Sequence, residues 1–141
     1  MMIRSLPAIS APKSKLLLSL VAMAALALVS PVTAASAADI EKGAKVFKKC
    51  VSCHMVGDKA KNLVGPQLNG IVGREIASIE GYKYSKGMIA YAETQGIWSA
   101  EALDAYLLSP RKAVKGTRMG FAGLRKEKDR VNVIAYLAEQ K

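Results

Sequence analysis

The stretch Lys48–Met55, KKCVSCHM, contains both cysteines of the 141-residue chain and its only histidine. Cys50, Cys53 and His54 form C-x-x-C-H, which is the attachment pattern of a c-type haem. Two thiols at this spacing can bond the edge of a porphyrin while the adjacent imidazole turns onto the iron. The stretch therefore predicts one covalently bound haem c, held by Cys50 and Cys53, with His54 as an iron ligand.

Other uses of paired cysteines explain this stretch less well. A cysteine pair in an oxidising compartment usually forms a disulfide, but a disulfide gives no reason for the adjacent His54. A zinc site needs about four ligands, and the sequence has no second cluster of ligand residues. A thioredoxin-like redox pair is expected beside a βαβ pattern, which is not visible here.

Residues 1–37 have the pattern of a cleavable secretory signal peptide. Basic residues precede the apolar run Leu16–Ser30, LLLSLVAMAALALVS, and small residues follow up to an A-x-A site at Ala35–Ala37. The run has 15 residues, fewer than the roughly 20 that cross a bilayer, and an uncleaved membrane anchor is the alternative. We expect cleavage after Ala37, export to the periplasm and one mature domain over residues 38–141.

The chain is strongly basic, with 21 Lys and Arg against 11 Asp and Glu and a net charge of +10. Such a surface favours acidic proteins, nucleic acid or anionic lipid as partners. Export argues against nucleic acid, so we expect acidic docking surfaces on other proteins. Basic residues cluster around the segments that carry the candidate iron ligands: Lys48, Lys49, Arg111, Lys112, Arg118, Arg125 and Lys126.

The rest of the sequence predicts an all-α domain of short helices joined by long loops. Helices are expected over residues 39–54, 85–95, 99–108 and 126–139, and Asp39, Ser85 and Ser99 are the candidate N-caps. The third helix stops at Ser109-Pro110, because the residue before a proline resists the helical region. Glycines interrupt residues 56–80, and no stretch alternates long enough to predict a strand.

The first and last helices both carry apolar stripes, so we expect them to cross. Residues recurring at helical spacing mark one face of each helix. The stripe of the first helix consists of Ile40, Gly43, Ala44 and Phe47, and that of the last helix of Val131, Ile134, Ala135 and Ala138, widened by Leu137.

A haem held only by His54 leaves one coordination position of the iron open. The chain has no second histidine, so the candidates beyond residue 37 are Met55, Met88 and Met119. Met55 adjoins His54 and cannot reach the opposite face of the ring. Met119 follows a loop containing proline and glycine that can wrap that face, whereas Met88 lies at a helix start, where core packing is the usual role. Reach favours Met119, with Met88 or no methionine ligand as the alternatives.

Several further segments match, in order, those of a known family. They are CVSCH, GPQLNGIVGR, GYKY, GIW, AYLLSPRKAVKGTRMGFAGL and, in the last helix, VIAYL. On these segments the chain resembles the class I c-type cytochromes, in particular bacterial cytochrome c2 and mitochondrial cytochrome c, over essentially the whole mature sequence. The resemblance implies the cytochrome c fold, wrapped around one covalent haem, and selects Met119 with His54 as the two iron ligands.

The resemblance also implies contacts to the haem and its first ligand. The carbonyl of Pro66 accepts the proton on the second ring nitrogen of His54, which fixes the orientation of the ring. Arg74, Tyr84 and Trp98 contact a buried haem propionate, whose charge needs such donors.

Further residues are assigned by the same resemblance. Tyr106 and Thr117 belong to a hydrogen-bond network near Met119, and Phe121 covers the haem edge. One departure is Lys115, which stands where the family commonly has proline in the methionine loop. Gly43, Phe47 and Tyr136 pack the crossing of the terminal helices.

An iron closed on both sides suits electron transfer better than bond-making, and a methionine ligand raises its potential. The resemblance therefore implies a monomeric, soluble periplasmic one-electron carrier and not an enzyme. A bc1-type complex would be the donor, and a terminal oxidase or a photosynthetic reaction centre the acceptor. The alternatives are a cytochrome subunit or electron donor of a periplasmic dehydrogenase or peroxidase system, and a haem-based gas sensor.

Overall fold

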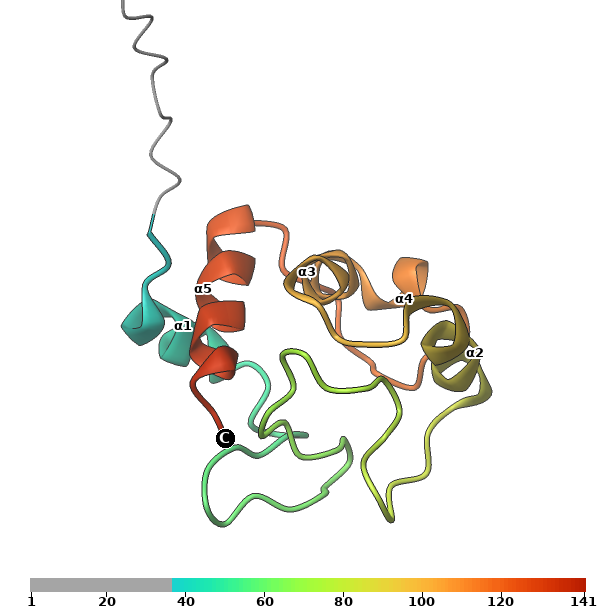
Figure 1. The fold of residues 1–141 in the computed structure, drawn as a ribbon. Helices are drawn as coiled ribbons and strands as arrows, with labels where there is room; N and C mark the ends of the chain where they lie inside the picture. The colour runs from blue at the N-terminus through green and yellow to red at the C-terminus, as the bar shows by residue number, and fades with distance from the viewer. Residues whose placement is uncertain (1–36) are drawn as a thin grey trace, which may run out of the picture. The chain divides into compact units, whose positions relative to one another are not determined.

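The computed structural model describes residues 37–141, which form short α-helices joined by long loops (Figure 1). The helices are α1 (Ile40–Phe47), α2 (Lys86–Gln95), α3 (Ala100–Leu108), α4 (Pro110–Ala113) and α5 (Glu127–Ala138). Within the described residues the only strand-like feature is an isolated antiparallel bridge between Glu75 and Ile97. The all-α prediction is confirmed.

The predicted signal peptide lies, apart from Ala37, outside the described residues. Between residues 37 and 141, no helix has both the length and the apolar character needed to cross a bilayer.

Three helices begin at the predicted caps. The side-chain oxygen of each cap accepts a hydrogen bond from the amide three residues later, at 2.9 Å for Asp39 and 3.1 Å for Ser85 and Ser99. Each bond satisfies an amide that has no partner within the helix. The short helix α4 was not predicted; it begins at Pro110, whose fixed φ suits a first helical position.

The first helix is shorter than predicted, because α1 ends at Phe47 and does not continue through the motif. The Cys50 amide donates to the Phe47 carbonyl at 2.8 Å, an i→i+3 bond that tightens the backbone. A separate helical turn follows, in which the His54 amide donates to the Cys50 carbonyl at 2.9 Å. Both thiols and the imidazole therefore come from one turn, directly after α1.

Helices α1 and α5 lie against each other, as the sequence predicted (Figure 1). A Cβ added to Gly43 would overlap the Asn132 carbonyl and lie 2.7 Å from Tyr136 Cβ, so the two backbones approach closely only because residue 43 is glycine. The rings of Phe47 and Tyr136 pack at 5.4 Å between centroids.

The predicted apolar faces of these two helices are partly wrong. Ile40 and Val131 are 47% and 38% exposed, and Ala138 is also exposed. The buried residues are Gly43, Val46 and Phe47 on α1, and Arg130, Asn132, Val133 and Leu137 on α5. Helix α5 packs against both α1 and α3, and two of its buried positions hold polar side chains with specific partners, which a search for apolar periodicity passes over.

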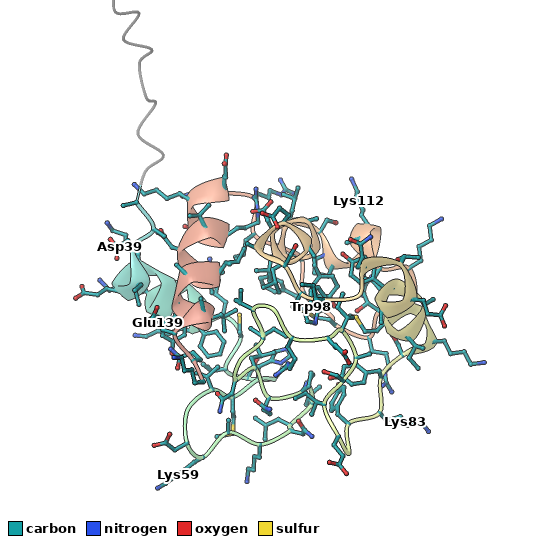
Figure 2. All side chains as sticks on the ribbon, in the orientation of Figure 1. Asp39, Lys59, Lys83, Trp98, Lys112 and Glu139 are labelled. Atoms are coloured by element: carbon teal, nitrogen blue, oxygen red, sulfur yellow. The ribbon has the colours of Figure 1, made fainter. Side chains whose placement is uncertain are left out.

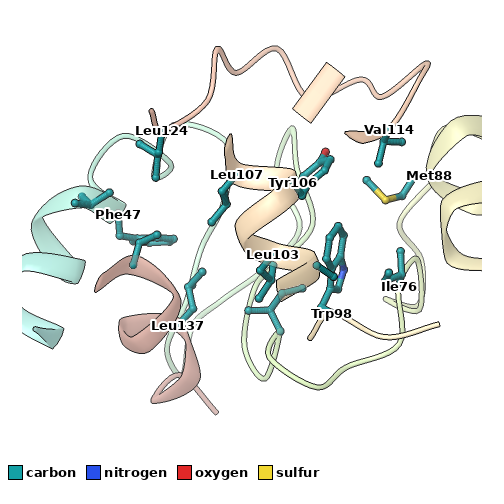
Figure 3. Packing of buried hydrophobic residues seen from close by; sticks show 14 residues of the cluster. Phe47, Ile76, Met88, Trp98, Leu103, Tyr106, Leu107, Val114, Leu124 and Leu137 are labelled. Carbon is teal, nitrogen blue, oxygen red and sulfur yellow. The ribbon is translucent and has the colours of Figure 1, made fainter. Parts of the chain in front are cut away.

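Helix α3 lies at the centre of the core (Figure 3). Its buried residues Leu103, Tyr106 and Leu107 separate two groups of apolar side chains. On the side of α1 and α5 these are Phe47, Leu124 and Leu137, and on the side of α2 they are Ile76, Met88, Trp98 and Val114. The long loop over residues 54–84 lies below these helices in the view of Figure 1 and supplies further residues of the site.

Candidate functional site

The imidazole of His54 is held by the backbone of the following loop. Its Nδ1 lies 2.7 Å from the carbonyl oxygen of Pro66 and donates a hydrogen bond to it. With the proton on Nδ1, the lone pair of Nε2 is free to bind a metal. Burial lowers the pKa of His54, against a smaller opposite effect of the Pro66 carbonyl, so the neutral ligand form is favoured.

Gly65 allows the loop to close on this ring. A Cβ at residue 65 would overlap Cε1 of His54 and lie 2.7 Å from its Nδ1. The Gly65 amide also donates to the Cys53 carbonyl at 2.9 Å, which fastens the loop to the motif turn. Sequence analysis treated this glycine only as an interruption of regular structure. Its position directly before Pro66 is the one signal that it serves the site.

Cys50 and Cys53 are partly buried free thiols on the same turn as His54. Burial raises the pKa of Cys50, although the charge of Lys49 acts in the opposite direction. In the part of the chain that the structure describes, no group of three or more His, Cys, Asp or Glu residues is arranged to hold a metal ion. Both cysteines are free and lie on the turn that carries the imidazole, so their thiols are available for covalent attachment.

Met119 lies half-buried on the loop between α4 and α5. Its amide donates to Thr117 Oγ1 at 3.2 Å, and that hydroxyl lies 2.9 Å from the Tyr106 hydroxyl. Burial raises the pKa of Tyr106, so its hydroxyl keeps its proton. Tyr106 and Thr117 therefore do form a network next to Met119. Met88, by contrast, is 8% exposed and packs in the core near Val114 (Figure 3).

Arg74 lies near Trp98 and Tyr84, the other two residues expected to contact a haem propionate. The Trp98 amide donates to the Arg74 carbonyl at 2.8 Å. The Tyr84 hydroxyl, close enough to interact electrostatically with the guanidinium, accepts from the Ile79 amide at 3.3 Å. Since that bond uses a lone pair of Tyr84, the hydroxyl proton remains available for another acceptor.

One nitrogen of the Arg74 guanidinium is both buried and without a partner in the described part of the chain. Nη1 donates to the Asn69 carbonyl at 2.6 Å and Nη2 to the Gln67 carbonyl at 3.3 Å. Nε is buried and has no partner among the described residues. Burial also lowers the pKa of Arg74, because the charged form has lost water. A buried orphan donor on a cation suits a carboxylate of a bound group, and the residues present therefore fit a haem propionate.

The seven basic residues that the sequence singled out are all exposed. Lys49 Nζ lies 3.9 Å from Asp129, a long and weak ion pair. Lys112 extends outward from α4 (Figure 2). Arg111 and half-buried Phe121 line a shallow hollow of about 290 Å³, together with Gly120, the residue that follows Met119.

Comparisons with known proteins show the family of the chain. A sequence model of the family described as Cytochrome c matches residues 40–141. The chain is 45% identical to cytochrome c-554 of Methylosinus trichosporium, over 90% of this chain and 93% of that protein. It is 44% identical to cytochrome c2 of Rhodomicrobium vannielii, over 85% of this chain and 94% of that protein.

A solved structure gives the same result. The structure of cytochrome c2 from Rhodospirillum centenum matches with a TM-score of 0.67 and 40% identity, over 72% of this chain and 98% of that one. The fold is therefore that of cytochrome c, the cofactor is haem c, and Cys50 and Cys53 supply the pair of thiols that its attachment needs. The match to the family model and the identity to these relatives show that the chain belongs to the cytochrome c family.

Proposed function

We propose that the protein is a soluble periplasmic electron carrier. In this proposal it accepts single electrons from a bc1-type complex and passes them to a terminal oxidase or a photosynthetic reaction centre. The observation that carries it is the 2.7 Å hydrogen bond from His54 Nδ1 to the Pro66 carbonyl, which leaves Nε2 for the iron on the same turn as both thiols. Cytochromes of the c family are electron carriers, and this chain belongs among them.

The chain's own residues have distinct tasks. Cys50 and Cys53 hold the haem covalently, while His54 and Met119 bind the iron from two different segments. Methionine is a soft ligand that favours the reduced iron and so raises the potential. When bound, haem c supplies an iron that cycles between Fe(III) and Fe(II).

The surroundings keep the site closed and charge-balanced. Arg74 offers its buried Nε, and Tyr84 its hydroxyl proton, to the propionate. Trp98 and Tyr106 are 7% and 6% exposed, and their rings pack at 5.1 Å between centroids, which excludes water from that side of the site. A dry site penalises the more highly charged ferric state, which acts in the same direction as methionine.

The partners and the compartment are inferred from charge and from the leader pattern. The exposed basic residues around Met119 and the motif turn favour acidic docking surfaces. Transient docking suits a carrier, since it must release each partner quickly. The signal-peptide pattern of residues 1–37 supports export to the periplasm.

The test compares the two candidate methionine ligands. We expect ferric wild-type protein to show the weak red sulfur-to-iron charge-transfer band, and the ferrous form to bind carbon monoxide poorly. Met119→Leu should abolish the band and open the iron to carbon monoxide. Met88→Leu, a volume-conserving change in the core, is the matched control and should leave both properties unchanged. An intact band in Met119→Leu, or an open iron in the wild type, would overturn the proposal.

A further inference from the structure

Helix α2 approaches the backbone of the methionine loop at a glycine. Gly87 lies in the first turn of α2, and a Cβ added to it would overlap the carbonyl oxygen of Lys115. The same Cβ would lie 3.0 Å from the carbonyl carbon of Lys115 and 3.2 Å from that of Gly116. All three atoms belong to the backbone, which yields far less easily than the end of a flexible side chain.

On one side, the contact between Gly87 and Lys115 adjoins the hydrophobic core. Met88 and Val114, the neighbours of Gly87 and Lys115, are 8% and 1% exposed and lie close together in Figure 3. On the outside is a shallow hollow of about 230 Å³ whose lining is mainly small side chains and backbone: Gly87, Ala90, Tyr91, Ala113, Val114 and Lys115. At Gly87 itself the neighbouring atoms of the loop are backbone atoms, so the fit at this point depends on residue 87 having no side chain.

Few other interactions fix the loop at this point. Within residues 37–141 the Lys115 amide donates no hydrogen bond and its carbonyl accepts none. The next fixed point is the turn at Gly116, with φ +78°, closed by a 3.2 Å bond from the Thr117 amide to the Val114 carbonyl. A proline at 115 would restrict the backbone by itself, but lysine does not.

We infer that Gly87 is a positioning residue for Met119. Because it lacks a side chain, the first turn of α2 closes on Lys115 and Gly116 and holds the segment that presents the thioether. This contact restricts the backbone of the loop, as a proline at position 115 would do by itself. This inference rests on the proposed function, since it assumes that Met119 binds the iron.

The direct test is Gly87→Ala in the haem-loaded protein. Alanine normally stabilises a helix relative to glycine, but here the added methyl pushes the loop outward. We expect covalent haem content to stay at the wild-type level, the red charge-transfer band to weaken, and the affinity of the ferric protein for added imidazole to rise by about fivefold or more, as overpacking displaces the competing ligand. Wild-type imidazole affinity with an intact band would overturn the inference.

A control separates crowding from a general loosening of α2. Glu93 is exposed on the same helix, and Glu93→Gly lowers helix stability without adding bulk beside Lys115. It should leave imidazole affinity unchanged. An increase as large as that in Gly87→Ala would show that helix stability, not the close contact, governs the loop, and would contradict the inference.

A second variant tests the mechanism by rescue. Val114 has φ −128° and ψ 100°, close to the region favoured before a proline, and within residues 37–141 Lys115→Pro removes no backbone hydrogen bond of the Lys115 amide. In the double variant Gly87→Ala/Lys115→Pro, imidazole affinity should return toward the wild-type value, because proline restricts the loop independently of α2. A double variant that binds imidazole as tightly as Gly87→Ala would contradict this.

Hydrogen exchange in the wild-type protein gives a test that needs no variant. The Ile89 amide bonds to the Ser85 carbonyl at 3.1 Å in α2, and the Thr117 amide lies in the loop. If the two segments hold each other, both amides should open together and exchange with the same protection. Clearly different protection would overturn the inference. Failure of the proposed function is distinguishable, because it would appear in the wild type as a missing charge-transfer band.

Discussion

The buried guanidinium of Arg130 donates through Nε to Asp104 Oδ1 at 2.7 Å and so joins α5 to α3. Its Nη1 also donates to the carbonyls of Leu124 and Arg125, at 2.9 Å and 3.2 Å. The segment that leads from Met119 into α5 is therefore held by a side chain of α5 itself. Arg130 was not among the predicted site residues, because a lone arginine in a helix gives no sign of burial.

Replacing Asp104 should destabilise the fold without removing the haem. Asp104→Ala leaves the Arg130 charge, 8% exposed, without its anion. Breaking such a pair costs several kcal/mol when both partners are buried, but Asp104 is 37% exposed, so we expect a loss of about 1–2 kcal/mol. Urea unfolding of the holoprotein measures it, with exposed Lys128→Ala as the control on α5. Equal unfolding midpoints for Asp104→Ala and the wild type would contradict the prediction.

Thr117→Val should weaken the hold on Met119. The substitution keeps the shape of residue 117 but removes the acceptor of the Met119 amide and the partner of Tyr106. Losing a hydrogen bond of this kind costs about 1 kcal/mol, so we expect imidazole to bind the ferric iron about fivefold more tightly. Thr94→Val is the matched control, since the exposed Thr94 hydroxyl donates to the Tyr91 carbonyl of its own helix, α2. Equal imidazole affinity in Thr117→Val and the wild type would refute the prediction.

Asp39 should contribute stability that depends on pH. Its bonds to the side chain and the amide of Lys42 hold the pKa of Asp39 below the ordinary value for a carboxyl of this kind. A carboxyl with a lowered folded-state pKa stabilises the protein above the unfolded-state pKa, and loses this effect as pH falls through the folded-state value. Asp39→Asn keeps a good cap but carries no charge.

The wild type should therefore be more stable than Asp39→Asn at about pH 6, and the difference should shrink toward about pH 2.5. Urea unfolding of both holoproteins across this range measures the effect, and all other acid-sensitive groups are common to both. A stability difference that does not change with pH would show that the Asp39 charge has no role.

The features predicted correctly from the sequence are those that depend on neighbours in the chain. The caps at Asp39, Ser85 and Ser99 and the stop before Pro110 are all encoded within a few residues. Such local signals decide where a helix begins or ends whatever it later packs against.

The features that were missed depend on distant partners. The buried face of α5 is set by α1 and α3 together, and it includes Asn132, whose Oδ1 accepts from the Asp39 amide at 2.9 Å. The roles of Gly65 and Gly87 follow from His54 and from Lys115, which the chain brings to them only on folding. Periodicity and spacing contain no information about such contacts, so the sequence predicted Gly65 only as a break in regular structure and assigned no role to Gly87.

Charge reversal at Lys112 should slow electron transfer in a salt-dependent way. Lys112 is exposed on α4, near the Met119 loop, and Lys59 is exposed on a different side of the molecule (Figure 2). Charges act over about 30 Å at 0.01 M salt but only about 3 Å at 1 M, so a steering charge matters mainly at low salt.

We therefore expect Lys112→Glu to reduce the bimolecular rate of reduction by bc1-containing membranes about tenfold or more at 0.01 M salt, and little at 1 M. Lys59→Glu changes the net charge by the same amount and should have a clearly smaller effect. Because both variants carry equal net charge, any difference between them reports where the partner docks. Equal slowing by the two variants, or equal slowing of Lys112→Glu at both salt concentrations, would contradict docking through the basic residues around Met119.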